Sequence, residues 1–224
     1  MKADSTILSK ALVGLFLLFF AHFISICSNI PLYLIAIHVP TSLGQITIVS
    51  LSVVVVILLI GILYCLYAFK FRFPKFKIKN FLWALVFAIG LVLANTEFSI
   101  INQLLTGSVP LNNAILETYN KGTAKIFLVI TVVILGPFLE ELVYRGLIQR
   151  WLHEAIFVKC RWNDFISVFL SSCFFASVHA SQNLTGYLVY FVIGLFLGVL
   201  FNIFGDLRLN VIVHSINNLI AVFV

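Results

Sequence analysis

The sequence predicts an all-α protein: a polytopic transmembrane helical bundle of about seven spans with its N-terminus in the cytoplasm. Of its 224 residues, 62% are hydrophobic and only 10% are charged, and the mean hydropathy is +1.15. Both observations lie far outside the range of soluble globular proteins. Because no polar stretch is long enough to fold as a soluble domain, we expect one membrane domain with short loops.

The apolar runs give the order of the spans, since about 20 apolar residues cross the hydrocarbon layer as a helix. We expect spans at about residues 8–28, 45–69, 81–95 or a little beyond, 124–149, 165–180, 187–204 and 209–224. The first run follows Lys2 and Lys10 and has no cleavage site of small residues, so we expect it to remain as a span. The longest loop is expected at 96–122, and a charged cytoplasmic segment at 150–164.

The basic residues give the orientation. If the N-terminus is inside, only Lys121 and Lys125 fall outside, and all other Lys and Arg residues fall on the cytoplasmic side or at its membrane end. These are Lys2, Lys10, Lys70, Arg72, Lys75, Lys77, Lys79, Arg145, Arg150, Lys159, Arg161 and Arg208. This asymmetry follows the positive-inside rule. The net charge of +6 therefore indicates contact with the lipid bilayer and its anionic headgroups, and not nucleic-acid binding.

The span at 124–149 carries adjacent carboxylates, which are expensive inside hydrocarbon and therefore need a reason. Glu141 and Arg145 are four residues apart, so they lie on one helical face as a candidate ion pair, whereas Glu140 points about 100° away. Pro137 lacks an N–H group, so we expect a kink that frees the carbonyl of Val133. Glu140 is then left available for chemistry. The alternative is a purely structural ion pair between helices.

Two of the later spans carry motifs at one-turn spacing. In the span at 165–180, Phe175 and His179 share a face. In the span at 187–204, Gly194 and Gly198 permit close approach of a neighbouring helix, which is a common packing feature.

The last span, at 209–224, places His214 and Asn218 one turn apart. A single histidine in such a helix is usually a packing residue, but ionisable groups on three spans are expected to turn toward one another or toward water. We therefore expect Glu140, His179 and His214 to converge on one cavity. A carboxylate can then act as a general base toward water, a histidine can orient that water, and His and Asn can donate to an oxyanion.

Other functions remain open on the residues alone. Two Glu and two His could bind zinc, although the sequence has no His-Glu-x-x-His motif. A non-catalytic membrane scaffold could use the same motifs for helix packing against a partner such as a sensor kinase. A proton-coupled transporter would also need intramembrane Glu and His, but we find no inverted repeat or paired broken helices.

Taken in order, the motifs resemble those of the CPBP intramembrane protease family. That family joins the type II CAAX prenyl endopeptidases to the bacterial Abi and bacteriocin self-immunity proteins. The motifs are the acidic stretch, Phe175-x-x-x-His179, the glycine pair and His214-x-x-x-Asn218. The resemblance covers 124–224 as a catalytic transmembrane core, and 1–123 holds N-terminal helices without a recognisable motif.

The resemblance implies an intramembrane endopeptidase of the CAAX and Abi type. Glu140 would be the general base, with Glu141 and Arg145 as its structural and electrostatic partners. His179 would help to position water, and His214 with Asn218 would form the oxyanion site. The mechanism implied is of the glutamate type and requires no cofactor, with zinc as the alternative.

The resemblance also implies a substrate class and a location. The substrate would be a membrane-embedded or membrane-associated peptide or protein, and a second membrane protein is a further expected partner. Eukaryotic prenyl proteases often carry a third Glu, whereas this chain has two, so it looks more like the bacterial immunity and regulatory branch. Its location would be the bacterial plasma membrane, as a multi-pass protein.

One expectation concerns depth in the bilayer. At 1.5 Å per residue, Glu140 lies about 15 Å from the expected end of its span at Arg150, but His179 lies about 22 Å from Asp164. We expect that either the span at 165–180 starts outside the bilayer, or helix tilt and the kink at Pro137 bring the two side chains to one level.

Overall fold

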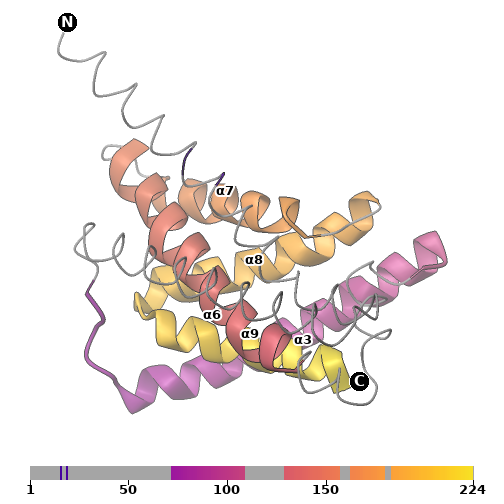
Figure 1. The fold of residues 1–224 in the computed structure, drawn as a ribbon, viewed down its shortest axis with the longest axis horizontal. Helices are drawn as coiled ribbons and strands as arrows, with labels where there is room; N and C mark the ends of the chain where they lie inside the picture. The colour runs from indigo at the N-terminus through magenta and orange to yellow at the C-terminus, as the bar shows by residue number, and fades with distance from the viewer. Residues whose placement is uncertain are drawn as a thin grey trace, which may run out of the picture.

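The structure is a computed structural model that describes Phe16, Phe19 and residues 72–108, 129–156, 162–179 and 183–223. Within these ranges every regular element is helical. Their packing forms one bundle, in which α3 and α9 lie beside α8, and α7 packs along the other side of α8 (Figure 1). The all-α class is therefore confirmed for the described part of the chain. The spans expected at 8–28 and 45–69 lie outside it, apart from the two phenylalanines.

The first long described helix is α3, which runs from Ile78 to Thr106. It ends at Gly107, whose φ of 70° lies in the left-handed region that favours glycine. The expectation of a span at 81–95 followed by a loop from residue 96 is therefore wrong. The polar residues of 96–106 suggested a loop, but the helix continues through this stretch to Thr106.

The acidic motif lies on a single helical stretch that crosses α8 and α9 in the view of Figure 1. It consists of η1 (Val129–Leu135), α6 (Gly136–Glu141), η2 (Leu142–Gln149) and η3 (Leu152–Ile156). The three η elements have the wide turns of a π-helix, in which each N–H group bonds five residues back. Such turns occur often at functional sites. The expected end of this helix at Gln149 is wrong, because it continues to Ile156.

The extra length explains the depth problem that the sequence posed. Glu140 lies 16 residues before the end of η3 at Ile156, and His179 lies 16 residues after the start of α7 at Asn163. At an α-helical rise both distances are about 24 Å. The two side chains do lie at one level, since Glu140 Oε2 is 3.8 Å from His179 Nε2, and the part played by tilt and the kink stays a prediction.

The carbonyl of Val132, five residues before Pro137, is bonded to the last helix. In the wide register before α6, the missing N–H group of Pro137 would have bonded to Val132, five residues back, and not to Val133. The carbonyl of Val132 instead accepts a hydrogen bond of 2.9 Å from Asn218 Nδ2. The last helix thus supplies the donor that Pro137 lacks.

The remaining helices are α7 (Asn163–Ser177), α8 (Leu184–Phe204) and α9 (Leu207–Phe223). Close packing of α7 on α8 depends on the glycine pair. A Cβ atom on Gly194 would lie 3.0 Å from both Cα and Cβ of Ser172, and one on Gly198 would lie 3.0 Å from Val168 Cγ1. Only glycine fits this interface without a shift of α7.

Two of the described helices, α3 and α8, are long and apolar enough to cross a membrane, and α9 is a shorter apolar helix. The outer surface of α3 carries exposed aliphatic side chains such as Leu82, Val86 and Leu93, while Ala84, Ala88 and Leu91 are buried against the bundle. This division suits a helix with one face toward lipid. The total of seven spans and the cytoplasmic N-terminus stay predictions.

Candidate active site

Three ionisable side chains from three helices meet in the centre of the bundle. Glu140 Oε2 lies 3.8 Å from His179 Nε2 and 3.7 Å from His214 Nε2. Glu140 keeps 19% of its side chain exposed and His179 13%, whereas His214 keeps 3%. The expected convergence is therefore present, with Glu140 and His179 at the more open side. Glu140 Oε2 has no hydrogen-bond partner among the described residues.

The second carboxylate has the opposite character. Glu141 is fully buried and accepts hydrogen bonds from three side chains, one on η2 and two on α9. Arg145 Nη1 lies 3.1 Å and His214 Nδ1 2.9 Å from its Oε1, and Asn210 Nδ2 lies 3.1 Å from its Oε2. The predicted ion pair of Glu141 and Arg145 is confirmed. The pairing balances both buried charges, as burial of a carboxylate requires.

The glycine pair of α8 offers its main-chain carbonyl oxygens to two side chains of η2. Arg145 Nη2 donates to the carbonyl of Gly194 at 2.9 Å, and one turn further along Gln149 Nε2 donates to the carbonyl of Gly198 at 3.0 Å. Because glycine has no side chain, the two helices come close enough for these bonds. The guanidinium of Arg145 also lies 4.8 Å from the centre of the Phe175 ring, in cation–π distance.

The ring of His179 is held on both faces and at one nitrogen. Tyr190 stacks on it with a centroid distance of 4.5 Å and an interplanar angle of 17°, and Phe175 lies 4.4 Å away. Its Nδ1 lies 2.7 Å from the carbonyl of Phe175. A carbonyl oxygen only accepts, so Nδ1 carries the proton. The neutral ring therefore presents an unprotonated Nε2 to Glu140.

His214 has the same arrangement for a different reason. Its Nδ1 donates to the ionised Glu141, so its Nε2 also faces Glu140 without a proton when the ring is neutral. Three atoms with lone pairs thus point at one small volume. Such a cluster favours a bound proton or a water molecule that donates to it.

Asn218 does not reach Glu140 through the contacts that the structure shows. Its Nδ2 donates to Val132 and its Oδ1 accepts from Asn217 at 3.3 Å. One of the two amide hydrogens is therefore committed to the wall of the site. The oxyanion role expected for Asn218 would use the other amide hydrogen, and this role stays a prediction.

Two polar residues near the carboxylates were not singled out from the sequence. Asn210 is fully buried and bridges Glu141 to the carbonyl of Leu197, at 2.7 Å. Its position one turn before His214 was the available signal. Tyr144, one turn after Glu140, is 2% exposed, and its hydroxyl has no partner among the described residues.

The described part of the chain contains no group of three or more His, Cys, Asp or Glu side chains arranged to hold a metal ion.

Fold and site together define a helical bundle with apolar spans that encloses a cluster of carboxylate and imidazole groups. A family model, the type II CAAX prenyl endopeptidase Rce1-like family, matches residues 122–220. The matched segment contains every motif named above, and it confirms the family resemblance found in the sequence. The family is membrane-embedded, and the match supports an intramembrane protease of the CAAX type. No curated protein and no solved structure matches the chain.

Proposed function

We propose that the chain is an intramembrane endopeptidase that hydrolyses a peptide bond in a membrane-associated peptide or protein, with Glu140 as the base that activates water. The observation that carries this proposal is the position of Glu140 Oε2 between His179 Nε2 and His214 Nε2, at 3.8 and 3.7 Å. Both distances are too long for direct hydrogen bonds. They suit a water molecule that bridges the groups.

The positions of the protons on the two histidine rings support a role for Glu140 as general base. With Nδ1 protonated on both rings, Glu140, His179 and His214 all offer acceptors to such a water. Glu140 takes one proton as the water oxygen bonds to the carbonyl carbon, and the carbonyl electrons move to its oxygen. The proton then passes to the amide nitrogen as the C–N bond breaks. A histidine that holds a further proton can donate to the oxyanion.

Glu141 and Arg145 act as positioning residues in this proposal. Glu141 fixes the ring of His214 through Nδ1, and Arg145 neutralises the charge of Glu141. Glu140 is then the carboxylate whose negative charge faces the bound water. Asn218 donates its second amide hydrogen to the oxyanion, beside His214.

We further propose the bacterial immunity and regulatory branch of the family, in the plasma membrane. The support is the acidic motif with two adjacent glutamates, where prenyl proteases of eukaryotes often carry three. The substrate is then a membrane peptide or protein without a required prenyl group.

The test compares the membrane proteomes of cells with wild-type protein, Glu140→Gln and Glu97→Gln. Glu97 is an exposed carboxylate of α3, so its change is a chemically matched control. We expect at least one cleavage product to disappear with Glu140→Gln alone. With purified protein and that substrate, turnover should fall about 10²-fold or more, because the base is lost while the shape is kept.

Two outcomes would contradict the proposal. Unchanged cleavage with Glu140→Gln would remove Glu140 as the base. A wild-type cellular phenotype for Glu140→Gln at equal protein amount, without any cleavage difference, would instead support the scaffold function.

A further inference from the structure

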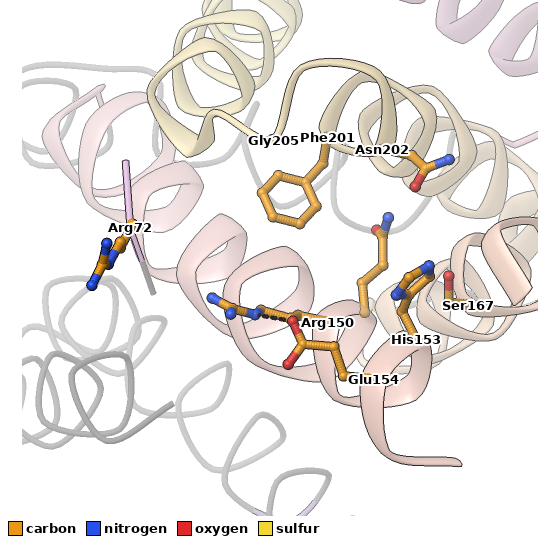
Figure 2. Close-up of a pocket in the computed structure, with 9 residues that line it drawn as sticks. Arg72, Arg150, His153, Glu154, Ser167, Phe201, Asn202 and Gly205 are labelled. Carbon is orange, nitrogen blue, oxygen red and sulfur yellow. Dashed lines mark hydrogen bonds and ion pairs between the residues drawn. The ribbon is translucent and has the colours of Figure 1, made fainter. Parts of the chain in front are cut away.

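A second cavity lies on the helix of the acidic motif, toward its C-terminal end. Its volume is about 390 Å³, within the range of small-molecule sites. Its polar lining includes Arg72, Gln149, Arg150, His153, Ser167 and Asn202 (Figure 2). None of these residues contacts Glu140 in the structure, and Gln149 lies two turns further along the helix. The cavity is therefore separate from the candidate active site.

The cavity has an excess of positive charge at its mouth. Arg72 lies on one side and His153 on the opposite side in Figure 2. Arg150 pairs with Glu154 at 2.6 Å, so these two charges balance. His153 Nε2 lies 2.7 Å from Asp164. The charge of Arg72 is then uncompensated by an acidic lining residue, and an anion is the complementary ligand.

The inner end of the cavity offers an acceptor. Gln149 is 3% exposed, and its Nε2 is used by the carbonyl of Gly198. Its Oε1 has no hydrogen-bond partner among the described residues. A buried acceptor of this kind is costly unless a donor reaches it. A ligand that fills the cavity therefore needs a hydroxyl or ammonium group beside its anionic group.

The cavity is placed at the level of the basic and aromatic segment before α3, residues 72–79. Arg208 ties this segment to the bundle, because its Nη2 donates to the carbonyl of Pro74 at 2.8 Å. Its guanidinium also lies 5.8 Å from the rings of Phe73 and Phe76. Exposed aromatic and basic residues are typical of the headgroup layer. Arg72 therefore belongs to a segment whose composition suits the headgroup layer.

We propose that this cavity binds a glycerophosphate group, with the phosphate at Arg72 and a glycerol hydroxyl donating to Gln149 Oε1. Basic pockets between helices on the headgroup side are suited to anionic lipid headgroups. The same chemistry is offered by a phosphatidylglycerol headgroup and by soluble glycerol phosphate. The proposal concerns ligand binding and does not depend on proteolysis.

The test uses the purified full chain in a neutral detergent, with dioctanoyl phosphatidylglycerol as the probe. Its affinity is compared with those of the matching phosphatidylcholine and phosphatidic acid. We expect phosphatidylglycerol to bind about tenfold or more tightly than either, because phosphatidylcholine has no net charge or donor and phosphatidic acid has no glycerol headgroup. Arg72→Gln should weaken it about tenfold. Lys75→Gln, which removes one charge from the same segment outside the cavity, should change it less than about twofold.

Equal affinity for phosphatidylglycerol and phosphatidylcholine would overturn the proposal. Equal losses of phosphatidylglycerol affinity in Arg72→Gln and Lys75→Gln would also overturn it, because they would indicate general attraction to a basic surface. Equal affinity for phosphatidic acid would overturn the role of Gln149. Competition by sn-glycerol 1-phosphate identifies the source of the group. Full competition points to a soluble ligand and none to a lipid headgroup, and the proposed chemistry holds in both cases.

Discussion

Asn218 and Val132 are joined by a hydrogen bond of 2.9 Å from a side-chain amide on α9 to a main-chain carbonyl of η1. The bond compensates for Pro137, which has no N–H group to offer at the position that the wide helical register requires. A proline in one helix is thus matched by an asparagine in another, and the two helices that carry Glu140 and His214 are fixed to each other.

The first prediction tests this compensation. Asn218→Leu should destabilise the protein by about 1–3 kcal/mol, because it leaves a shielded carbonyl unsatisfied. Pro137→Ala restores an N–H group, so the double variant Pro137→Ala with Asn218→Leu should be more stable than Asn218→Leu alone. Thermal unfolding in one detergent measures all three. Strictly additive losses would show that the two residues are independent.

The second prediction separates the two glutamates. Glu141→Gln leaves Arg145 buried without its partner and should cost about 3–5 kcal/mol, whereas Glu140→Gln should hardly change stability. Adding Arg145→Met to Glu141→Gln should recover part of the stability and none of the activity. Melting curves and a cleavage assay on the same preparations decide it. If Glu140 proved to be the residue whose loss destabilises the fold, the roles would have to be exchanged.

The third prediction concerns the glycine pair. Gly194→Ala places a methyl group 3.0 Å from the backbone of Ser172, so α7 and α8 must separate, at a cost of about 1–3 kcal/mol. Gly90→Ala is the control, since its methyl group would meet only the edge of the Phe196 ring, at 3.3 Å. The control should melt near the wild-type temperature. Similar melting temperatures for both variants would argue against tight packing at Gly194.

The fourth prediction concerns metal dependence. We propose water activation by Glu140 without a metal ion. Dialysis against a strong chelator should leave turnover unchanged, with metal content measured on the same sample. A loss of activity that added zinc restores would favour the zinc alternative.

A large part of the candidate active site could be predicted from the spacing of residues along the sequence. The one-turn separation of Glu141 and Arg145 predicted their ion pair, because neighbours on a helix face need no knowledge of the rest of the fold. The cost of ionisable groups in hydrocarbon predicted that Glu140, His179 and His214 would meet. The helical class followed from hydropathy alone.

Other contacts could not be predicted, for physical reasons. Arg145 donates to the carbonyl of Gly194, an acceptor that every residue carries and that no sequence pattern marks. Asn210 was missed because one amide in an apolar helix has many packing roles. The bond from Asn218 to the carbonyl of Val132 was not expected, because the width of the turns in η1 is not encoded in any single residue.

The length of helix beyond Glu140 sets how far a substrate has to extend. Glu140 and His179 both lie 16 residues from the helix ends at Ile156 and Asn163, or about 24 Å at an α-helical rise. An extended chain covers at most about 3.3–3.6 Å per residue. A peptide that enters from that end must therefore be unfolded over roughly seven residues before its scissile bond reaches Glu140. For the endopeptidase proposed above, we therefore expect folded segments close to the bond to be excluded and flexible ends or unwound helices to be preferred.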